Sequence, residues 1–236
     1  MRELLFSFPL LVCLAVAMLH EPPVIQPWTA PEATWAQQVA AVQAGRQDTI
    51  VVERQIVTDR NLADVANLER LIVLELGQSK LTARGIQQLQ KLPNFRRLTL
   101  RGRPVDDVML AEICAIPTVR RLNLPHTIVT DAGLAALRSR PQLVQLRFGS
   151  AHVTDAGLDA IVTLPKLRAL HLVEVPITDL GLAKLSNMPQ LESLYIDGAS
   201  ATDAGYEQLL KRLPELHLHI DQRHHDRDVR KGTHEH

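Results

Sequence analysis

Acidic residues recur in this sequence at one fixed spacing. Aspartates stand 24 residues apart in five successive places, and four of them follow a threonine in a Thr-Asp-x-Gly motif. A row of carboxylates along one edge of a protein could bind calcium. Calcium, however, takes about six to eight oxygen ligands from several directions, and the sequence contains no second acidic row. We therefore expect no metal site in this row, which consists of Asp107, Asp131, Asp155, Asp179 and Asp203.

The setting of each Thr-Asp pair favours a structural role. A threonine hydroxyl at the start of a helix accepts a hydrogen bond from a free backbone N–H. An aspartate in the first turn meets the positive end of the helix dipole, and the glycine lets the helix approach its neighbour closely. We expect each motif to mark a joint at which a short helix begins.

Histidines are concentrated at the C-terminal end, where they could bind a metal. Six of the ten histidines lie in the last twenty residues, and histidine-rich tracts can bind zinc, nickel or copper through imidazole. Their spacing matches no fixed site, and metal binding by this tail is the alternative to the function derived below. His217 and His219 alternate along the last expected strand and would cover its open face.

The sequence carries no recognisable catalytic motif. His126, His152 and His171 fall in different repeats, and no serine or cysteine recurs with them as a nucleophile would. No phosphate loop, HExxH or dinucleotide-binding fingerprint is present. The two cysteines, Cys13 and Cys114, provide neither a disulfide framework nor a cysteine zinc site. We expect a protein that is not an enzyme and needs no cofactor.

The 24-residue period contains two halves with different hydrophobic spacing. In residues 167–172 the later leucines alternate, as they do in a strand with one buried face. In residues 157–164 the apolar residues fall about three apart, as along one side of a short helix. Pro165 ends that helix because it cannot donate to the preceding turn. One repeat is therefore a short strand, a loop and a short helix.

The pattern L-x-x-L-x-L, followed by (I/V)-T-D-x-G-L, resembles a leucine-rich repeat, with most similarity to the short ribonuclease-inhibitor-like and cysteine-containing subclasses. The resemblance covers about residues 48–221. The chain lacks the cysteine that opens each repeat of the cysteine-containing subclass, an F-box-like segment before the repeats, and cysteine-rich caps. The resemblance implies an α/β fold, a right-handed curved solenoid with a parallel sheet on the concave face and short helices on the convex face. It also implies a module that binds other proteins and is not itself an enzyme.

The N-terminal end differs from the repeats. Residues 1–19 contain an apolar run of sixteen residues from Leu4 to Leu19. As a helix this run would span about 24 Å, less than the roughly 30 Å hydrocarbon core of a membrane. We expect either a cleaved signal peptide or an uncleaved short membrane anchor. The protein is then exported or membrane-anchored, in a bacterial envelope or the extracellular space.

The rest of the chain divides into three parts. A proline-rich linker is expected at residues 20–30 and a disordered histidine-rich tail at residues 222–236. The repeat domain is expected at residues 31–221. It begins with a helical cap, because a bare solenoid end would expose its core. Trp35, Val39 and Val42 share one face of this predicted helix.

Side chains that point outward from the concave strands form the usual contact surface of a solenoid. In the 24-residue alignment, arginines gather near the middle of this face, with a tyrosine towards its C-terminal end. Arginines offer bidentate contacts to carboxylates or phosphates, and a tyrosine can anchor a partner. The same charges could instead only keep the face solvated. The candidate residues are Arg97, Thr99, Arg101, Arg121, Asn123, Gln145, Arg147, His171 and Tyr195.

The overall charge argues against nucleic acid as the partner. Lys plus Arg and Asp plus Glu number 26 each, and aromatic residues are 3% of the chain. A nucleic-acid surface would need a larger basic excess or interleaved aromatic residues. We expect a monomer that binds a protein, an acidic one where the arginine cluster makes the contact. It would meet a membrane only through an uncleaved N-terminal segment.

Overall fold

The computed structural model describes residues 32–102 and 104–224. These residues fall within one compact unit, Glu32–His236. The predicted signal peptide or anchor, the linker and most of the histidine-rich tail lie outside the described residues. Within them, no helix is both long enough and apolar enough to cross a membrane.

Each repeat contributes one strand to a parallel sheet, and the strands follow one another in chain order. Neighbouring strands pair with an offset of one repeat, so that Arg97 lies opposite Arg121 and Asn123 opposite Arg147. The two-residue strands β2 (Val57–Thr58) and β4 (Ser79–Lys80) form a small second sheet. The parallel strands of the main sheet are β1 (Thr49–Val52), β3 (Val73–Leu76), β5 (Arg97–Leu100), β6 (Arg121–Leu124), β7 (Gln145–Gly149), β8 (Ala169–Val173), β9 (Ser193–Asp197) and β10 (His217–Ile220).

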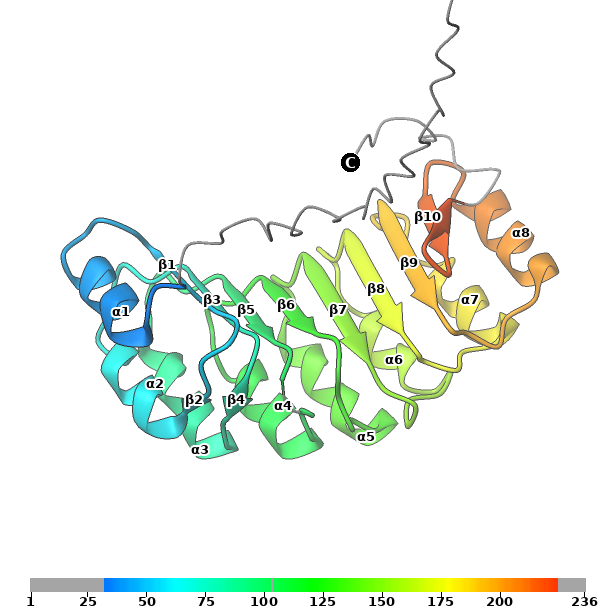
Figure 1. The fold of residues 1–236 in the computed structure, drawn as a ribbon. Helices are drawn as coiled ribbons and strands as arrows, with labels where there is room; N and C mark the ends of the chain where they lie inside the picture. Colours follow the sequence, from blue (N-terminus) through cyan, green and yellow to red (C-terminus); the bar gives the residue numbers. More distant parts are fainter. Residues whose placement is uncertain (1–31, 103, 225–236) are drawn as a thin grey trace, which may run out of the picture. The chain divides into compact units, whose positions relative to one another are not determined.

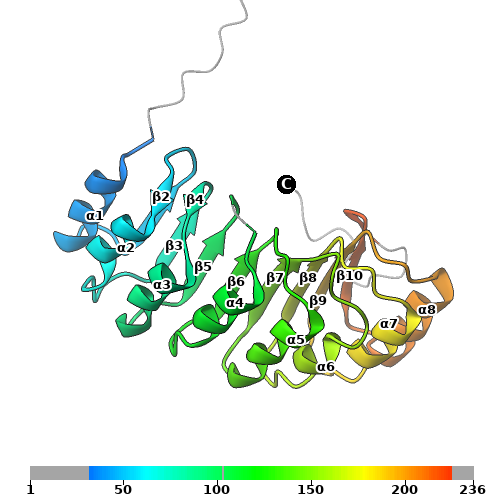
Figure 2. The ribbon, with the colours of Figure 1, turned by 90° about the horizontal axis from the view of Figure 1, so that it is seen from below.

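Short helices cover one face of this sheet and leave its other face open, as Figures 1 and 2 show. In the repeat that begins at Thr154, the first residues form a turn and the helix starts only at Leu158. The strand-and-helix solenoid expected from the 24-residue period is confirmed. The helices are α1 (Trp35–Gln43), α2 (Asp59–Val65), α3 (Ala83–Ile86), η1 (Gln87–Lys91), α4 (Asp107–Cys114), α5 (Asp131–Leu134), η2 (Ala135–Ser139), α6 (Leu158–Ile161), α7 (Asp179–Leu185) and α8 (Asp203–Arg212).

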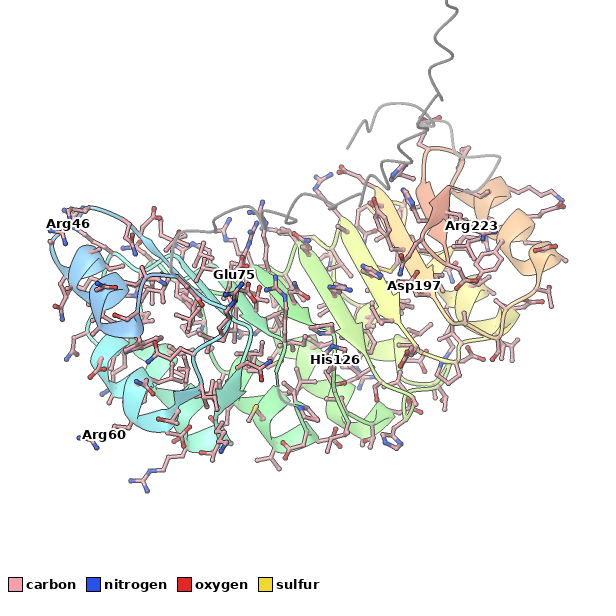
Figure 3. All side chains as sticks on the ribbon, viewed as in Figure 1. Arg46, Arg60, Glu75, His126, Asp197 and Arg223 are labelled. Atoms are coloured by element: carbon pink, nitrogen blue, oxygen red, sulfur yellow. The ribbon has the colours of Figure 1, made fainter. Side chains whose placement is uncertain are left out.

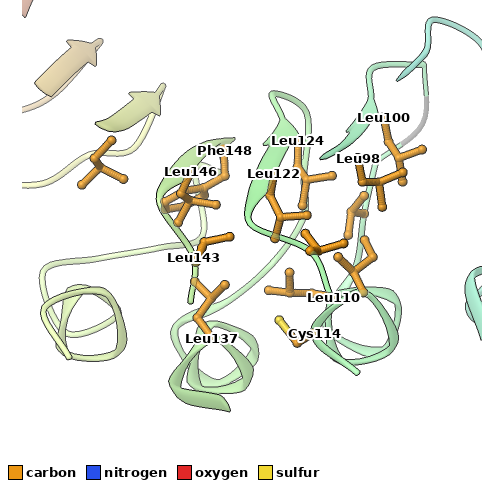
Figure 4. Packing of buried hydrophobic residues seen from close by; sticks show 14 of the residues in the cluster. Leu98, Leu100, Leu110, Cys114, Leu122, Leu124, Leu137, Leu143, Leu146 and Phe148 are labelled. Atoms are coloured by element: carbon orange, nitrogen blue, oxygen red, sulfur yellow. The ribbon is translucent and has the colours of Figure 1, made fainter. Parts of the chain in front are cut away.

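The core is a stack of aliphatic layers between the sheet and the helices (Figure 4). In β6, Leu122 and Leu124 are almost fully buried, while Arg121 and Asn123 point to the other face. Cys114 is buried among these leucines, and burial raises the pKa of its thiol to about 12. It therefore packs as a small hydrophobic residue. Fully burying each leucine contributes about 1.5–3 kcal/mol.

Helix α1 closes the N-terminal end of the sheet. Trp35, Val39 and Val42 are buried, as the helical pattern predicted. The Gln38 side chain takes the place of a further strand, because its Oε1 accepts from the N–H of Val51 at 2.8 Å and its Nε2 donates to the Val51 carbonyl at 2.5 Å. Both outward backbone groups of Val51 are therefore satisfied, which protects an edge that could otherwise pair with another chain.

A hairpin covers the C-terminal edge of the sheet. Strand β11 (Arg223–His224) runs antiparallel to β10, so the sheet extends to His224, beyond the domain end expected at residue 221. Asp221 and Gln222 adopt positive φ of 47° and 61° in the turn, as tight two-residue hairpins require. Asp221 also accepts from the N–H of Gly198 at 2.9 Å, which ties the turn to the preceding repeat.

The Thr-Asp motif joins each repeat to the next. Thr130, Thr178 and Thr202 cap their own helices as predicted, and the Thr130 hydroxyl accepts from the N–H of Gly133, whereas the N-cap of α6 is Gly157 and not Thr154. The aspartates do more than the expected dipole contact. Each carboxylate accepts from both the N–H and the hydroxyl of the threonine one repeat later, at 2.6–2.9 Å. We call this contact the clamp. It links Asp59–Thr82, Asp107–Thr130, Asp131–Thr154, Asp155–Thr178 and Asp179–Thr202.

The motif glycine is the third part of the clamp. A Cβ on Gly133 would lie 1.9 Å from Oδ1 of Asp107 in the preceding repeat. Only a residue without a side chain leaves room for that carboxylate. We expected the glycine to let its helix approach the neighbouring repeat, and the group that it approaches is the clamping aspartate.

One joint lacks the clamp. Between α3 and α4, Ala83 stands where the aspartate would be, Asp106 replaces the threonine, and Met109 replaces the glycine. Asp106 caps its own helix by accepting from the N–H of Met109 at 2.8 Å. The three changes fit one another. An aspartate at position 83 would face the carboxylate of Asp106 and the bulky side chain of Met109.

Candidate functional site

The nine candidate residues line two adjoining hollows on the concave face, which is formed by the outward side chains of β1, β3 and β5–β10. The arginine hollow, of about 260 Å³, is lined by Glu75, Arg97, Thr99, Arg101, Arg121, Leu122, Asn123 and Gln145. The tyrosine hollow, of about 180 Å³, is lined by Gln145, Leu146, Arg147, Ala169, Leu170, His171 and Tyr195. Gln145 belongs to both, so the two hollows make one groove across β3 and β5–β9.

Two of the candidate arginines are neutralised by acidic residues of earlier repeats. Arg101 Nη1 lies 2.5 Å from Glu53 Oε1, and its Nη2 lies 3.6 Å from Glu75 Oε2. Arg97 Nη1 lies 3.5 Å from Glu75 Oε1. Figure 3 shows Glu75 on the strand side of the repeats and Arg60 of α2 on the helix side. The basic cluster is therefore less basic than the alignment suggested.

Glu53 and Glu75 were missing from the candidate residues. Glu75 could have been found, because it stands in the same outward column as Thr99, one repeat earlier. Glu53 is harder to find, because it precedes Arg101 by two repeats. Gly77 stands between them and has no side chain to fill the space. The space at Gly77 lets Arg101 reach Glu53, and this glycine is the feature of the sequence from which the pairing could have been predicted.

Arg121 and Arg147 keep their charge available. Among the described residues, neither forms an ion pair with an acidic side chain. Nε of Arg147 and Oδ1 of the neighbouring Asn123 are buried and, within the described part of the chain, have no hydrogen-bond partner. Each unsatisfied buried polar atom costs about 1–3 kcal/mol. These two atoms therefore favour an occupant that can satisfy them.

Aromatic rings gather at the C-terminal side of the groove. The Tyr195 ring stacks on His219 with a centroid distance of 4.1 Å, and His171 lies 5.3 Å away on the preceding strand. His171 Nε2 is 2.8 Å from Asp197 Oδ2, which fixes the imidazole ring. His217 and His219 approach each other at 2.6 Å between their Nε2 atoms. Tyr195 is therefore held between ordered neighbours.

The predicted metal-binding tail begins at the edge of what the structure describes. Residues 32–102 and 104–224 contain no group of three or more His, Cys, Asp or Glu side chains placed to hold a metal ion. Four aspartates of the predicted row, Asp107, Asp131, Asp155 and Asp179, are engaged in clamps, in line with the structural role expected for the row. Metal binding by the histidines beyond residue 224 stays a prediction.

Comparison with known proteins identifies the fold. No family model and no curated protein matches the chain. Among solved structures it is similar to internalin C2 of Listeria monocytogenes, with 23% identity and a TM-score of 0.57 over 76% of this chain and 72% of that chain. The chain has the leucine-rich-repeat fold. This likeness confirms the α/β leucine-rich-repeat solenoid, while the ribonuclease-inhibitor-like or cysteine-containing subclass stays a prediction.

Proposed function

We propose that this leucine-rich-repeat protein is a non-enzymatic interaction module that binds a partner protein through its concave face. The observation that carries the proposal is the groove formed by the arginine and tyrosine hollows. It contains two arginines without an acidic partner among the described residues, next to buried polar atoms that lack a hydrogen bond. Buried polar atoms without a protein partner are uncommon, so two of them beside one groove favour a bound group there.

The groove favours an acidic partner. Guanidinium groups bind carboxylates with two parallel hydrogen bonds, and this pairing strengthens where water is displaced. Arg121 and Arg147 are the residues that make this contact. Arg97 and Arg101 stabilise the wall of the groove through Glu75 and Glu53. The protein acts as a monomer, and its N-terminal residues favour export or membrane anchoring.

Affinity capture with charge-reversed variants tests the proposal. The full chain is immobilised and exposed to an extract of the source cells, and bound proteins are identified by mass spectrometry. The test variant is Arg121→Glu/Arg147→Glu. The matched control, Arg84→Glu/Arg138→Glu, makes the same charge change at exposed positions of α3 and η2 on the helix side. Thermal unfolding verifies that both variants fold.

The proposal predicts a protein that the wild type and the control recover and that the test variant loses. Equal recovery by all three chains would show that the concave arginines do not bind it. Loss from both variants alike would indicate a general charge effect and would also contradict the proposal.

A further inference from the structure

The two hollows differ in chemistry, and this difference restricts what can occupy them. We infer that the groove binds an extended acidic peptide segment of the partner, with a carboxylate at Arg121 and Arg147 and an apolar or aromatic side chain about three residues away in the tyrosine hollow. This inference rests on the proposed function and specifies the part of the partner that is bound.

The carboxylate position follows from the arrangement of charges. Glu75 and Glu53 already pair with Arg97 and Arg101, so the uncompensated positive charge lies further along the sheet. Arg121 is on β6 and Arg147 on β7, at diagonal outward positions. Asn123 and Gln145 stand between them and offer amide groups. A carboxylate at this place would meet two guanidinium groups and the N–H groups of these amides, while Oδ1 of Asn123, which can only accept, would accept from a backbone N–H of the peptide.

The apolar position follows from a gap in side-chain size. In one outward column, long Arg121 and Gln145 are followed by the small Ala169 and Ser193. The neighbouring column continues with the large His171 and Tyr195. Ala169 therefore leaves a space, and the apolar Leu146 and Leu170 also line it. Tyr195 offers an aromatic wall to a side chain that enters.

Tyr195 is preorganised for this role. Its ring stacks on His219 at an interplanar angle of 15°, and His219 is almost buried. On the other side it contacts His171, which is held by Asp197. Because these neighbours already restrict the ring, binding would cost little side-chain entropy.

The spacing of the two positions follows from sheet geometry. Arg121 and Ala169 lie on β6 and β8, which are separated by β7. Adjacent strands are about 4.8 Å apart, so the two positions are about 10 Å apart. An extended chain advances by about 3.3–3.6 Å per residue. In a polyproline II segment, side chains three residues apart point the same way and lie about 9 Å apart, so a peptide in this extended conformation that crosses the strands would place its acidic and apolar side chains about three residues apart.

Selection from a phage-displayed library of random dodecapeptides tests this inference. The full chain serves as bait, and the enriched sequences are aligned. We expect an Asp or Glu paired with Leu, Phe or Tyr at a separation of about three residues, because of the strand spacing. Sodium polygalacturonate, a carboxylated polysaccharide, is tested for direct binding to the chain by calorimetry and as a competitor of a fluorescein-labelled enriched peptide.

Variants assign the two halves of the motif to the two hollows. Arg121→Glu/Arg147→Glu should weaken binding of the labelled peptide at least about tenfold, because charge reversal replaces attraction by repulsion. Tyr195→Ala should remove the apolar preference from the selected sequences and leave the acidic one. Tyr195→Phe, which keeps the ring, should select the same sequences as the wild type. Arg84→Glu/Arg138→Glu is the control for total charge.

The outcomes separate this inference from the proposed function. Peptides enriched without the paired motif, or with the motif retained on Tyr195→Ala, would overturn the inference. Binding of polygalacturonate without any enriched peptide would overturn it in favour of a polysaccharide. If affinity capture recovers an Arg121-dependent partner while no paired motif is found, the proposed function stands and the inference falls. If capture shows no dependence on Arg121 and Arg147, the proposed function itself fails.

Discussion

A single carboxylate can bind two repeats together. Asp131 accepts from both the N–H and the hydroxyl of Thr154, at 2.8 and 2.7 Å. The sequence predicted helix starts at the Thr-Asp motifs, and this prediction holds for Thr130, Thr178 and Thr202. It could not predict that the aspartate bonds to the next repeat, because a local motif does not show how closely neighbouring repeats approach.

Removal of one clamp should destabilise the protein. Asp131→Ala loses two hydrogen bonds to Thr154 as well as the contact with its helix dipole. Asp203→Ala is the matched control, since Asp203 occupies the same motif position but has no clamped threonine among the described residues. We expect Asp131→Ala to lower the free energy of unfolding by about 1–2 kcal/mol more than the control does. Urea denaturation measures both values, and equal losses would contradict a role for the clamp.

The buried thiol and phenol should make stability fall at high pH. Burial raises the pKa of Cys114 from 9.0 to about 12 against a small opposing effect of Arg140. Burial, and then the charges of Asp221, Asp179 and Asp203, raise the pKa of Tyr206 from 10.0 to about 12. The unfolded state loses these protons at a lower pH than the folded state does. The stability that the two protonated groups contribute is therefore complete below about pH 9 and is lost as the pH rises towards 12.

Urea midpoints between pH 8 and pH 11 measure this effect. The wild type should keep its stability up to about pH 9 and lose it progressively above that pH. Cys114→Ala and Tyr206→Phe should each reduce the slope, since each removes one proton that the folded state retains. Slopes identical to the wild type would show that neither group is linked to folding.

At the scale of the element, the helices depend on the fit between successive repeats. Glycine inside a helix normally costs about 1 kcal/mol relative to alanine. In α5 this preference should be reversed, because a Cβ at Gly133 would lie 1.9 Å from Asp107 Oδ1. Gly133 therefore fits the carboxylate of the neighbouring repeat, although glycine has a low propensity for the helix in which it lies.

A double-mutant cycle tests this reversal. Gly133→Ala alone should lower the free energy of unfolding by about 1–3 kcal/mol, because the Asp107 carboxylate must move and give up its bonds to Thr130. In an Asp107→Ala background the same change should cost clearly less, because only the Cβ of residue 107 remains, 2.9 Å from the added Cβ. Circular dichroism during urea denaturation provides the four values. A Gly133→Ala effect of the same sign and size in both backgrounds would contradict the proposed fit.

The strands show how far sequence periodicity can predict a site. The outward columns aligned the nine candidate residues, and the observed register brings them into one groove. Charge was predicted less well, because each column was considered without the acidic residues beside it. The pairing of Arg101 with Glu53 crosses the empty position at Gly77 and depends on side-chain reach, which periodicity does not describe.

At the scale of the whole molecule, the repeats supply a continuous sheet whose ends are closed by α1 and by the β10–β11 hairpin. The repeated scaffold places residues from six repeats in one groove, although they are separated by up to 120 residues along the chain (75 to 195). Position in the fold was predictable because every repeat has the same length. The identity of the partner was not, since it depends on one local pattern of charge and size within that groove.

The central claim is that Arg121 and Arg147 bind an acidic protein partner, and the salt-dependent dissociation constant of the captured partner tests it most directly. The full chain, Arg121→Glu/Arg147→Glu and Arg84→Glu/Arg138→Glu are compared at low and physiological ionic strength. The account predicts at least about tenfold weaker binding for the concave variant and a reduced salt dependence, because the lost contacts are charge pairs. The helix-side control should match the wild type. A concave variant that binds as tightly as the wild type would contradict the account.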